Sequence, residues 1–440
     1  MIRALLAFLL LCLAAPAGAA DIRVHRETLP NGLVLQVVAR PALPIVTVEM
    51  GVRAGASRDP AGKAGTANLA AALLTEGTAT RSAAEIAEAI EFVGGSIGAE
   101  ADRDYATLSL SVLSRDLSMG LHVLADVARH PAFAPDEFER VRKEVAGAIR
   151  ADEDNPGRVA AKAFDRALFG DHPYARPVEG DTDGIAAITR DDVAAFHATH
   201  YVPNNAVLSF VGDVTPDMAR ALATEVFGDW ARRPLAPEPA QAPPELPDSR
   251  LLTIDRPVAQ ANVVLGHVGI TRDNPDFYPV VVMNYILGGG GFTSRVVKSV
   301  RDDQGLAYSV FTAFDARRQP GTFSAVFQTR NDNANQAIRS VLAELRRIQD
   351  APVTDQELDE AKSYLEGSFP LRLDTNRKTA YLLTFIEMYG LGVDYFDDYL
   401  ARIRRVTAAD VQRVARQYLR PDAMQWVVVA DQEAAAVAAP

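Results

Sequence analysis

An arginine and a tyrosine in the second half of the chain are the residues whose types and spacing point most directly to chemistry. Arg301 and Tyr308 follow a run of four glycines, residues 288–291, in the segment LGGGGFTSRVVKSVRDDQGLAYSV. The pattern predicts a helix from Thr293 to about Asp303 that ends at Gly305, with a strand directly after it. Arg301 would then lie in the last helical turn and Tyr308 at the start of the strand, so that the two side chains can converge across the turn.

Such a pair could hold negative charge on a substrate oxygen. A guanidinium is a permanent cation with a planar fork of donors, and a phenol adds one more donor. Neither group supplies a nucleophile. Each residue also has an ordinary interpretation, because an arginine near a helix C-terminus complements the helix dipole and tyrosine is common in strands. No Gly-Lys-Ser/Thr follows the glycines, which argues against a phosphate-binding loop.

The chain offers few metal ligands and little cysteine chemistry. Cys12 is the only cysteine, which excludes a disulfide framework, a thiolate zinc site and a cysteine nucleophile from the rest of the chain. Of the seven histidines, only His197 and His200 have ligand-like spacing on one helix face. The alternative is an ordinary amphipathic helix, because the matching segment of the second half carries Ala415 and Tyr418 instead. The formal net charge of -12 argues against a nucleic-acid binder.

The two halves of the chain repeat one pattern. Residues 188–214 align without a gap with residues 406–432, which pairs Thr189 with Thr407. In each copy a threonine stands three residues before an aspartate and predicts a capped helix start. A proline then interrupts the helical pattern and a β-rich run follows. The repetition indicates a duplicated domain.

Strands and helices are interspersed along both halves. Alternating apolar and polar residues predict half-buried strands near Val46, Tyr105, Asn262 and Gly321. Helical patterns cover residues 82–92, 135–153 and 354–367, the first with a Ser82/Glu85 capping box. The strict β-α alternation of a doubly wound sheet is missing. We therefore expect an α+β protein of two duplicated α/β sandwich domains, each a mostly antiparallel sheet covered by helices.

A segment rich in proline and alanine, residues 234–247, predicts a semi-rigid linker. It would join a first domain of residues 21–233 to a second of residues 248–440. No stretch after residue 20 is apolar enough to span a bilayer.

The first twenty residues predict a signal peptide. Arg3 precedes an apolar run, and Ala17-Gly18-Ala19 forms a small-x-small cleavage signature. The alternatives are an uncleaved membrane anchor and, less in keeping with Leu11, a lipid-modified Cys12. We expect an exported protein, periplasmic in a Gram-negative bacterium.

The order of these elements resembles the pitrilysin/insulinase family of zinc peptidases, which includes the mitochondrial processing peptidase. The resemblance covers nearly all of the chain after the signal peptide, and the glycine-rich segment from Leu287 is its most specific match. Four further segments match as well: LPNGLVLQVV from Leu29, GTANLAAALLTEGT from Gly65, FVGGSIGAEADRDY from Phe92 and YVPNNAVLSFVGDV from Tyr201.

The resemblance also implies that the catalytic zinc site is missing. Active members carry His-x-x-Glu-His on a first-domain helix, where two histidines bind Zn²⁺ and the glutamate activates the zinc-bound water. A downstream helix supplies a glutamate as third ligand. Here Asn68 and Ala72 replace the histidines, Ala71 replaces the base and Gly147 replaces the third ligand. We therefore expect no metal and no other cofactor in this chain, although alanine should preserve the helix.

In the family, the arginine and tyrosine of the second-domain motif hold the substrate's carbonyl oxygen. The resemblance thus implies that Arg301 and Tyr308 stabilise the transition state, and that substrate contacts the glycine loop, Gly288, Gly289, Gly290 and Gly291. Our leading hypothesis is a zinc-free, substrate-binding subunit, inactive alone. It would cleave peptides only in a heterodimer or larger complex with a homologous zinc-bearing subunit. The alternatives are a pseudo-peptidase that binds peptides or scaffolds a complex, and a standalone peptidase with a displaced metal site.

Overall fold

The computed structural model describes residues 22–236 and 241–438, so the signal-peptide prediction lies outside the described residues. Within this part of the chain the strands form two sheets. The first has the order β1-β2-β6-β3-β5-β4 and the second the order β7-β11-β8-β10-β9. The strands of the first sheet are β1 (His25–Thr28), β2 (Val34–Ala39), β3 (Ile45–Val52), β4 (Ser96–Ala101), β5 (Ala106–Leu113) and β6 (Ala206–Gly212). Those of the second are β7 (Arg250–Asp255), β8 (Gln260–Val268), β9 (Ala307–Asp315), β10 (Thr322–Arg330) and β11 (Gln425–Ala430).

The two sheets repeat one topology. Without β1, the order β2-β6-β3-β5-β4 corresponds strand by strand to β7-β11-β8-β10-β9. In both sheets the first pair is parallel, β2 with β6 and β7 with β11. The remaining neighbours are antiparallel. The expected duplicated α+β fold with mostly antiparallel sheets is confirmed.

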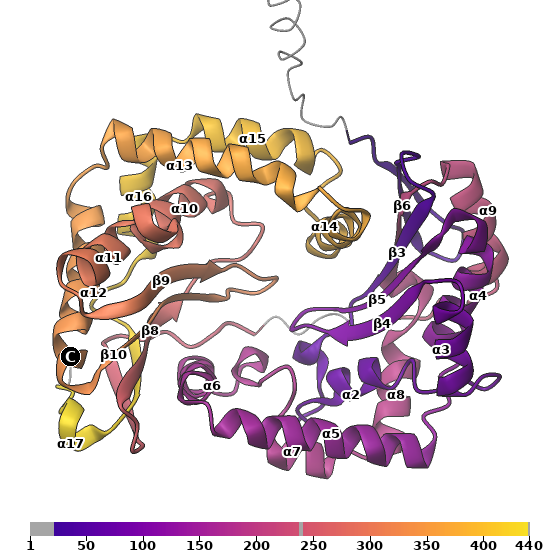
Figure 1. Ribbon diagram of the computed structural model, residues 1–440, viewed down its shortest axis with the longest axis horizontal. Helices are drawn as coiled ribbons and strands as arrows, with labels where there is room; N and C mark the ends of the chain where they lie inside the picture. The colour runs from indigo at the N-terminus through magenta and orange to yellow at the C-terminus, as the bar shows by residue number, and fades with distance from the viewer. Residues whose placement is uncertain (1–21, 237–240, 439–440) are drawn as a thin grey trace, which may run out of the picture.

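Helices pack on each sheet and complete two lobes (Figure 1). In the first lobe they are α2 (Thr66–Ala72), α3 (Ala83–Glu91), α4 (Leu117–Arg129), α5 (Pro135–Glu153), α6 (Pro156–Phe169), α7 (Thr182–Ala187), α8 (Arg190–His200) and α9 (Pro216–Phe227). In the second lobe they are α10 (Phe277–Asn284), α11 (Arg295–Val297), α12 (Ala334–Asp350), α13 (Asp355–Ser368), α14 (Asn376–Tyr389), α15 (Tyr395–Arg405), α16 (Ala408–Tyr418) and α17 (Gln432–Ala435). The capping box predicted at Ser82 forms, and the capped helix starts predicted at Thr189 and Thr407 are capping boxes as well. No helix within the described residues is both long and apolar enough to cross a bilayer.

Each lobe packs one of its helices on the sheet of the other lobe, so that the two lobes exchange helices. Helix α14 of the second lobe packs on β3 and β6 of the first, and α6 of the first lobe packs on β8 and β11 of the second. Figure 1 shows both helices in the space between the lobes. A glycine lies at each crossing: a Cβ at Gly51 would stand 2.4 Å from Cγ2 of Thr384, and one at Gly266 would stand 2.7 Å from Cζ of Phe164. Only glycine permits this close approach.

The helix exchange corrects one expectation about the strands. The alternating pattern near Val46 predicted a strand with one exposed face, but β3 is buried on both faces from its second residue onward. Strand β6 is buried along its whole length as well. The reason is that α14 covers the face that the first domain alone would leave open to solvent.

A buried polar network also joins the lobes. Asp104 of the first lobe accepts hydrogen bonds from the hydroxyl of Tyr174, from the hydroxyl of Tyr389 at 2.8 Å and from the backbone N–H of Arg318 at 3.2 Å. Arg318 lies in the loop that joins β9 to β10, so the far end of β9 is fixed against the first lobe.

Candidate functional site

The four positions that the resemblance assigns to the zinc site lie on two packed helices. Asn68, Ala71 and Ala72 belong to α2, and Gly147 belongs to α5, which packs against α2. Ala71 is buried, whereas Asn68, Ala72 and Gly147 are half-buried. None of these side chains is a zinc ligand in proteins. The framework of the site is therefore present, but its donor set does not fit zinc.

An aspartate holds the start of α2 in place. The carboxylate of Asp59 is buried and accepts hydrogen bonds from the backbone N–H groups of Gly65 and Ala67, both at 2.7 Å. These groups belong to the first turn of the helix, where backbone donors lack helical partners. Burial raises the pKa of Asp59 to about 7. The expected survival of this helix without the histidines is confirmed.

The two histidines with ligand-like spacing are used in packing. Nε2 of His197 lies 2.9 Å from the carbonyl oxygen of Ala128, to which it donates, and the ring stacks on Tyr201. His200 packs against the ring of Phe196. Burial lowers the pKa of each histidine to about 4. Within residues 22–236 and 241–438, no three His, Cys, Asp or Glu side chains gather in an arrangement that could hold a metal ion.

Arg301 and Tyr308 converge, as the sequence predicted. The guanidinium carbon of Arg301 lies 5.2 Å from the ring centroid of Tyr308. Gly305 has a left-handed φ of 62°, and its N–H donates to the carbonyl oxygen of Arg301 at 3.0 Å. This cap ends the helical segment and turns the chain into β9, which places Tyr308 beside the arginine.

The helix between the glycines and Arg301 is not the continuous α-helix that we expected from Thr293. It consists of a 3₁₀ turn (Gly291–Thr293), the short α11 and a π-helical segment (Lys298–Asp303). The break falls at Ser294, whose backbone is extended and whose hydroxyl donates to the carbonyl oxygen of Gly291 at 2.6 Å. The wider π-helical turn carries Arg301, and such turns are frequent at functional sites.

Sequence reasoning missed a third member of this cluster. The centroid of the Phe292 ring lies 4.5 Å from the guanidinium carbon of Arg301, so the cation contacts two aromatic rings. Phe292 is 72% exposed and Tyr308 is 87% exposed. This pair of exposed aromatic side chains is a candidate interaction surface. The available signal was an aromatic residue directly after the glycine run.

The four glycines do not share one role. A Cβ would stand 2.5 Å from Oγ1 of Thr312 at Gly288, 2.6 Å from Nδ2 of Asn284 at Gly289 and 2.6 Å from the carbonyl oxygen of Tyr285 at Gly290. Of the four, only Gly291 combines a left-handed φ of 63° with open space where a Cβ would stand. The first three glycines are therefore required by packing, and Gly291 by backbone conformation. Their contact with substrate stays a prediction.

The structure does not bring the Arg301/Tyr308 pair to the helices of the missing zinc site. Within the described residues, no hydrogen bond, ion pair or ring contact joins the pair to α2 or α5. Tyr308 lies near the start of β9, whereas Asp315 at its other end lies next to the loop that contacts the first lobe. Seven steps along the strand, at about 3.3 Å each, separate these two residues by about 23 Å. The two candidate half-sites therefore belong to different lobes (Figure 1).

The chain is similar to known proteins along nearly all of its length. Residues 36–182 match the family model described as insulinase (peptidase family M16), and residues 187–365 match the model described as peptidase M16 inactive domain. A Mycobacterium tuberculosis protein named an uncharacterized zinc protease is 32% identical over 405 residues, which cover 91% of this chain and 92% of that protein. A Streptomyces coelicolor protein with the same kind of name is 30% identical over 402 residues, covering 90% and 87%.

Solved structures agree with this relationship. The peptidase M16 inactive domain from Pseudomonas fluorescens superimposes with a TM-score of 0.88 and is 30% identical, covering 93% of this chain and 98% of that chain. A protease from Helicobacter pylori shares the fold, with a TM-score of 0.86 at 22% identity and coverage of 93% and 99%. On sequence, domain order and fold, the chain belongs to the insulinase/pitrilysin family, peptidase family M16.

Proposed function

We propose that this chain is the zinc-free, substrate-binding subunit of a heteromeric zinc metallopeptidase. It contributes Arg301 and Tyr308 to a composite active site, and a homologous partner subunit supplies the zinc. The observation that carries the proposal is the exposed cluster in which Arg301 lies beside Tyr308, on a chain whose matching zinc positions hold Asn68, Ala72 and Gly147.

The chemistry of peptide hydrolysis suits this cluster. Attack on a peptide carbonyl puts negative charge on its oxygen, and a guanidinium together with a phenolic hydroxyl stabilises that charge. Arg301 is available for this role, because the closest carboxylate oxygen within the described residues, Oδ1 of Asp302, stands 4.0 Å from its Nε, at the limit of an ion pair. The exposed ring of Phe292 would add apolar contact with the peptide chain. The complex would act on peptides outside the cytoplasm, in the periplasm if the source is a Gram-negative bacterium.

A pseudo-peptidase is the second candidate. The observation in its favour is that all four zinc-site positions are inert together, and that the second half of the chain matches a family model described as an inactive domain. Such a protein would bind peptides or scaffold a complex, and Arg301 and Tyr308 would then contribute nothing to turnover.

Reconstitution separates the two candidates. The chain would be purified alone, mixed with a homologous exported subunit that carries His-x-x-Glu-His, and assayed for peptide cleavage. We expect no cleavage by this chain alone and cleavage by the mixture that depends on Arg301 and Tyr308. A stable mixture whose turnover is unaffected by Arg301→Ala and Tyr308→Phe would support the pseudo-peptidase instead.

A further inference from the structure

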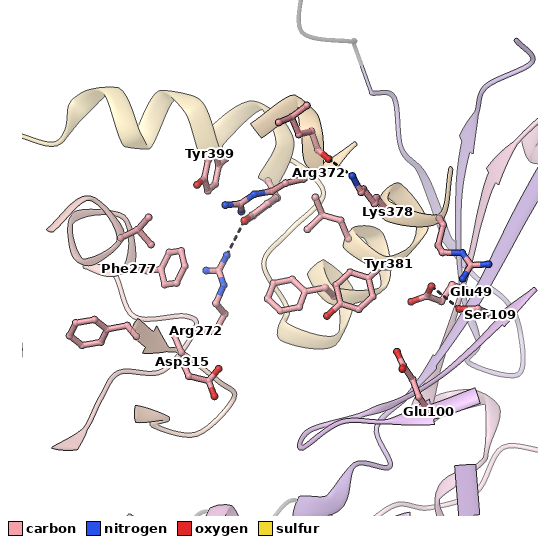
Figure 2. A pocket seen from close by; sticks show the side chains of 18 residues that line it. Glu49, Glu100, Ser109, Arg272, Phe277, Asp315, Arg372, Lys378, Tyr381 and Tyr399 are labelled. Atoms are coloured by element: carbon pink, nitrogen blue, oxygen red, sulfur yellow. Dashed lines mark hydrogen bonds between the residues drawn. The ribbon is translucent and has the colours of Figure 1, made fainter. Parts of the chain in front are cut away.

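A cavity of about 770 Å³ opens between the two lobes beside the exchanged helix α14 (Figure 2). Glu49 and Glu100 line it from the first lobe, on β3 and β4. Helix α14 and the second lobe contribute six aromatic side chains: Phe277, Phe314, Tyr381, Phe385, Tyr395 and Tyr399. Its size falls within the usual range of sites that bind small molecules.

Glu49 is buried in the wall of this cavity with half of its carboxylate unpartnered. The residue is 2% exposed. Oε2 accepts a hydrogen bond from Oγ of Ser109 at 3.2 Å, whereas Oε1 has no hydrogen-bond partner within the described residues. Buried carboxylates are costly and nearly always have their oxygens satisfied. An unpaired acceptor aimed at a cavity therefore points to a ligand that donates.

The cations around the cavity are engaged elsewhere. Nζ of Lys378 pairs with Asp374 at 2.9 Å, and Arg377 donates to Oγ of Ser96 at 3.2 Å. Arg272 lies over the ring of Phe277 at 3.6 Å, and Arg372, the fourth cation of the lining, lies over the ring of Tyr399 at 5.5 Å. None of these groups donates to Oε1 of Glu49, although the charge of Arg377 acts on the glutamate from a distance.

The duplicated lobe shows that the fold does not require an acid at this position. Strands β3 and β8 correspond through Gly51 and Gly266, the two glycines on which the exchanged helices rest. Two residues before each glycine stand Glu49 in the first lobe and Val264 in the second. The acid is therefore specific to one of two equivalent places in the fold.

The neighbouring strand positions are also less apolar in the first lobe than in the second. Glu49 pairs with Ser109, and Ser109 pairs with Gly98 on the edge strand β4. In the second lobe the corresponding positions are Val326 and Phe311, so that apolar side chains replace a serine and a glycine. These side chains leave a cavity of about 170 Å³. The larger cavity with Glu49 and Ser109 in its wall therefore has no counterpart on the second sheet.

From this geometry we propose that the cavity binds an ammonium or guanidinium group carried on an apolar stem, with Glu49 and Glu100 as its anionic partners. The cation would donate to Oε1 of Glu49, and its stem would lie along the rings of Tyr381 and Phe385 on α14. The same chemistry is offered by a lysine or arginine side chain of a peptide and by a free amphiphilic amine. The cavity is separate from Arg301 and Tyr308, so this proposal does not depend on the composite active site.

Calorimetric titration of the intact chain at pH 8, where Glu49 is ionised, tests the proposal. The probes are hexylamine, the blocked peptide acetyl-Ala-Lys-Phe-Ala-amide, and their neutral counterparts hexanol and the same peptide with norleucine in place of lysine. For each cationic probe that binds, we expect a Kd at least tenfold lower than the Kd of its neutral counterpart. Binding of both cationic probes indicates a site open to free amines, and binding of the peptide alone indicates a peptide side chain as the ligand.

Three variants assign the binding to this cavity. Glu49→Gln keeps the shape of the side chain and should weaken cation binding at least tenfold. Glu344→Gln, which changes another buried glutamate on α12, should leave it unchanged, as should Arg330→Ala at an exposed arginine at the end of β10. Unchanged binding in folded Glu49→Gln, or equal affinity for hexylamine and hexanol, would overturn the proposal. Loss of binding in Glu344→Gln as well would also overturn it, because the effect would not be specific to Glu49.

Discussion

The guanidinium of Arg301 lies over the ring of Tyr308, 5.2 Å from its centroid, because Gly305 turns the chain between them. Six residues of sequence separate the two side chains, yet the turn holds them on one surface. Their geometry is thus a local property of the second lobe and does not depend on the helices of the missing zinc site.

Substitution of this pair should lower turnover of the reconstituted complex without weakening assembly. Removal of one donor to a developing oxyanion typically costs about 10²–10³ in rate. We expect this loss of rate for Arg301→Ala and for Tyr308→Phe, and poor rescue of turnover by Arg301→Lys. The free-energy cost in the double variant should be smaller than the sum of the costs in the single variants. Turnover is measured by peptide cleavage and association by analytical ultracentrifugation.

Matched controls on the same lobe are Tyr364→Phe and Arg330→Ala, which change an exposed tyrosine and an exposed arginine outside the cluster. Both should retain normal turnover. Equal losses in the control and cluster variants would point to a general disturbance of the lobe.

The isolated chain should contain no stoichiometric zinc, and a designed ligand set should create a site. Asn68→His, Ala72→His and Gly147→Glu together restore three ligands on helices that already pack, and a Cβ at Gly147 meets no neighbouring atom. We expect about one zinc per chain in this triple variant by elemental analysis. Tightly held zinc in the natural chain, lost on substitution of His197 and His200, would contradict this interpretation of the natural site.

Single glycine substitutions should separate packing from backbone conformation. Gly288→Ala places a methyl group against Thr312 in a buried segment, and overpacking of this kind costs about 1–3 kcal/mol. Gly291→Ala meets no neighbouring atom, and its only cost is that of a left-handed backbone, about 1–2 kcal/mol. Urea unfolding gives both losses. If Gly291→Ala retains the fold but binds peptide less well, the loop's role in substrate binding is supported.

Glu49 should make stability depend on pH in a defined direction. Burial raises its pKa to about 7, above the ordinary value, and the charge of Glu100 adds to the effect while Ser109 and Arg377 oppose it. The folded state therefore holds a proton that the unfolded state releases, and the free energy of unfolding falls as pH rises from about 4 to about 7. Since one pKa unit corresponds to about 1.4 kcal/mol, the loss in the free energy of unfolding caused by Glu49 approaches about 3 kcal/mol above pH 7.

The isosteric variant Glu49→Gln removes that dependence. It should be more stable than the natural chain at pH 8, with the difference narrowing towards pH 4. Asp59 titrates in the same range but is present in both proteins, so its contribution cancels in the comparison. Parallel stability curves for the two proteins, from urea unfolding across this pH range, would show that Glu49 is not desolvated.

Local patterns in the sequence determined the elements and the inventory of reactive groups. The three capping boxes, the bounds of α5 and the turn at Gly305 follow from residues within one or two helical turns, because helix ends and left-handed turns are decided by nearby hydrogen bonds and sterics. The lack of zinc ligands at Asn68, Ala72 and Gly147 is likewise a property of residue type, once the resemblance assigns the positions.

Only the tertiary structure decided what lies on the second face of each sheet. Helix α14 comes more than 300 residues after β3, and no local periodicity records that it covers Glu49 and Gly51 from the other lobe. The same helix exchange buried a strand that was expected to have a solvent face, and it enclosed a cavity beside Glu49. Burial and the electrostatic environment of a side chain depend on contacts between distant segments, and the alternation of residues along one strand is the same whether its second face meets water or a helix.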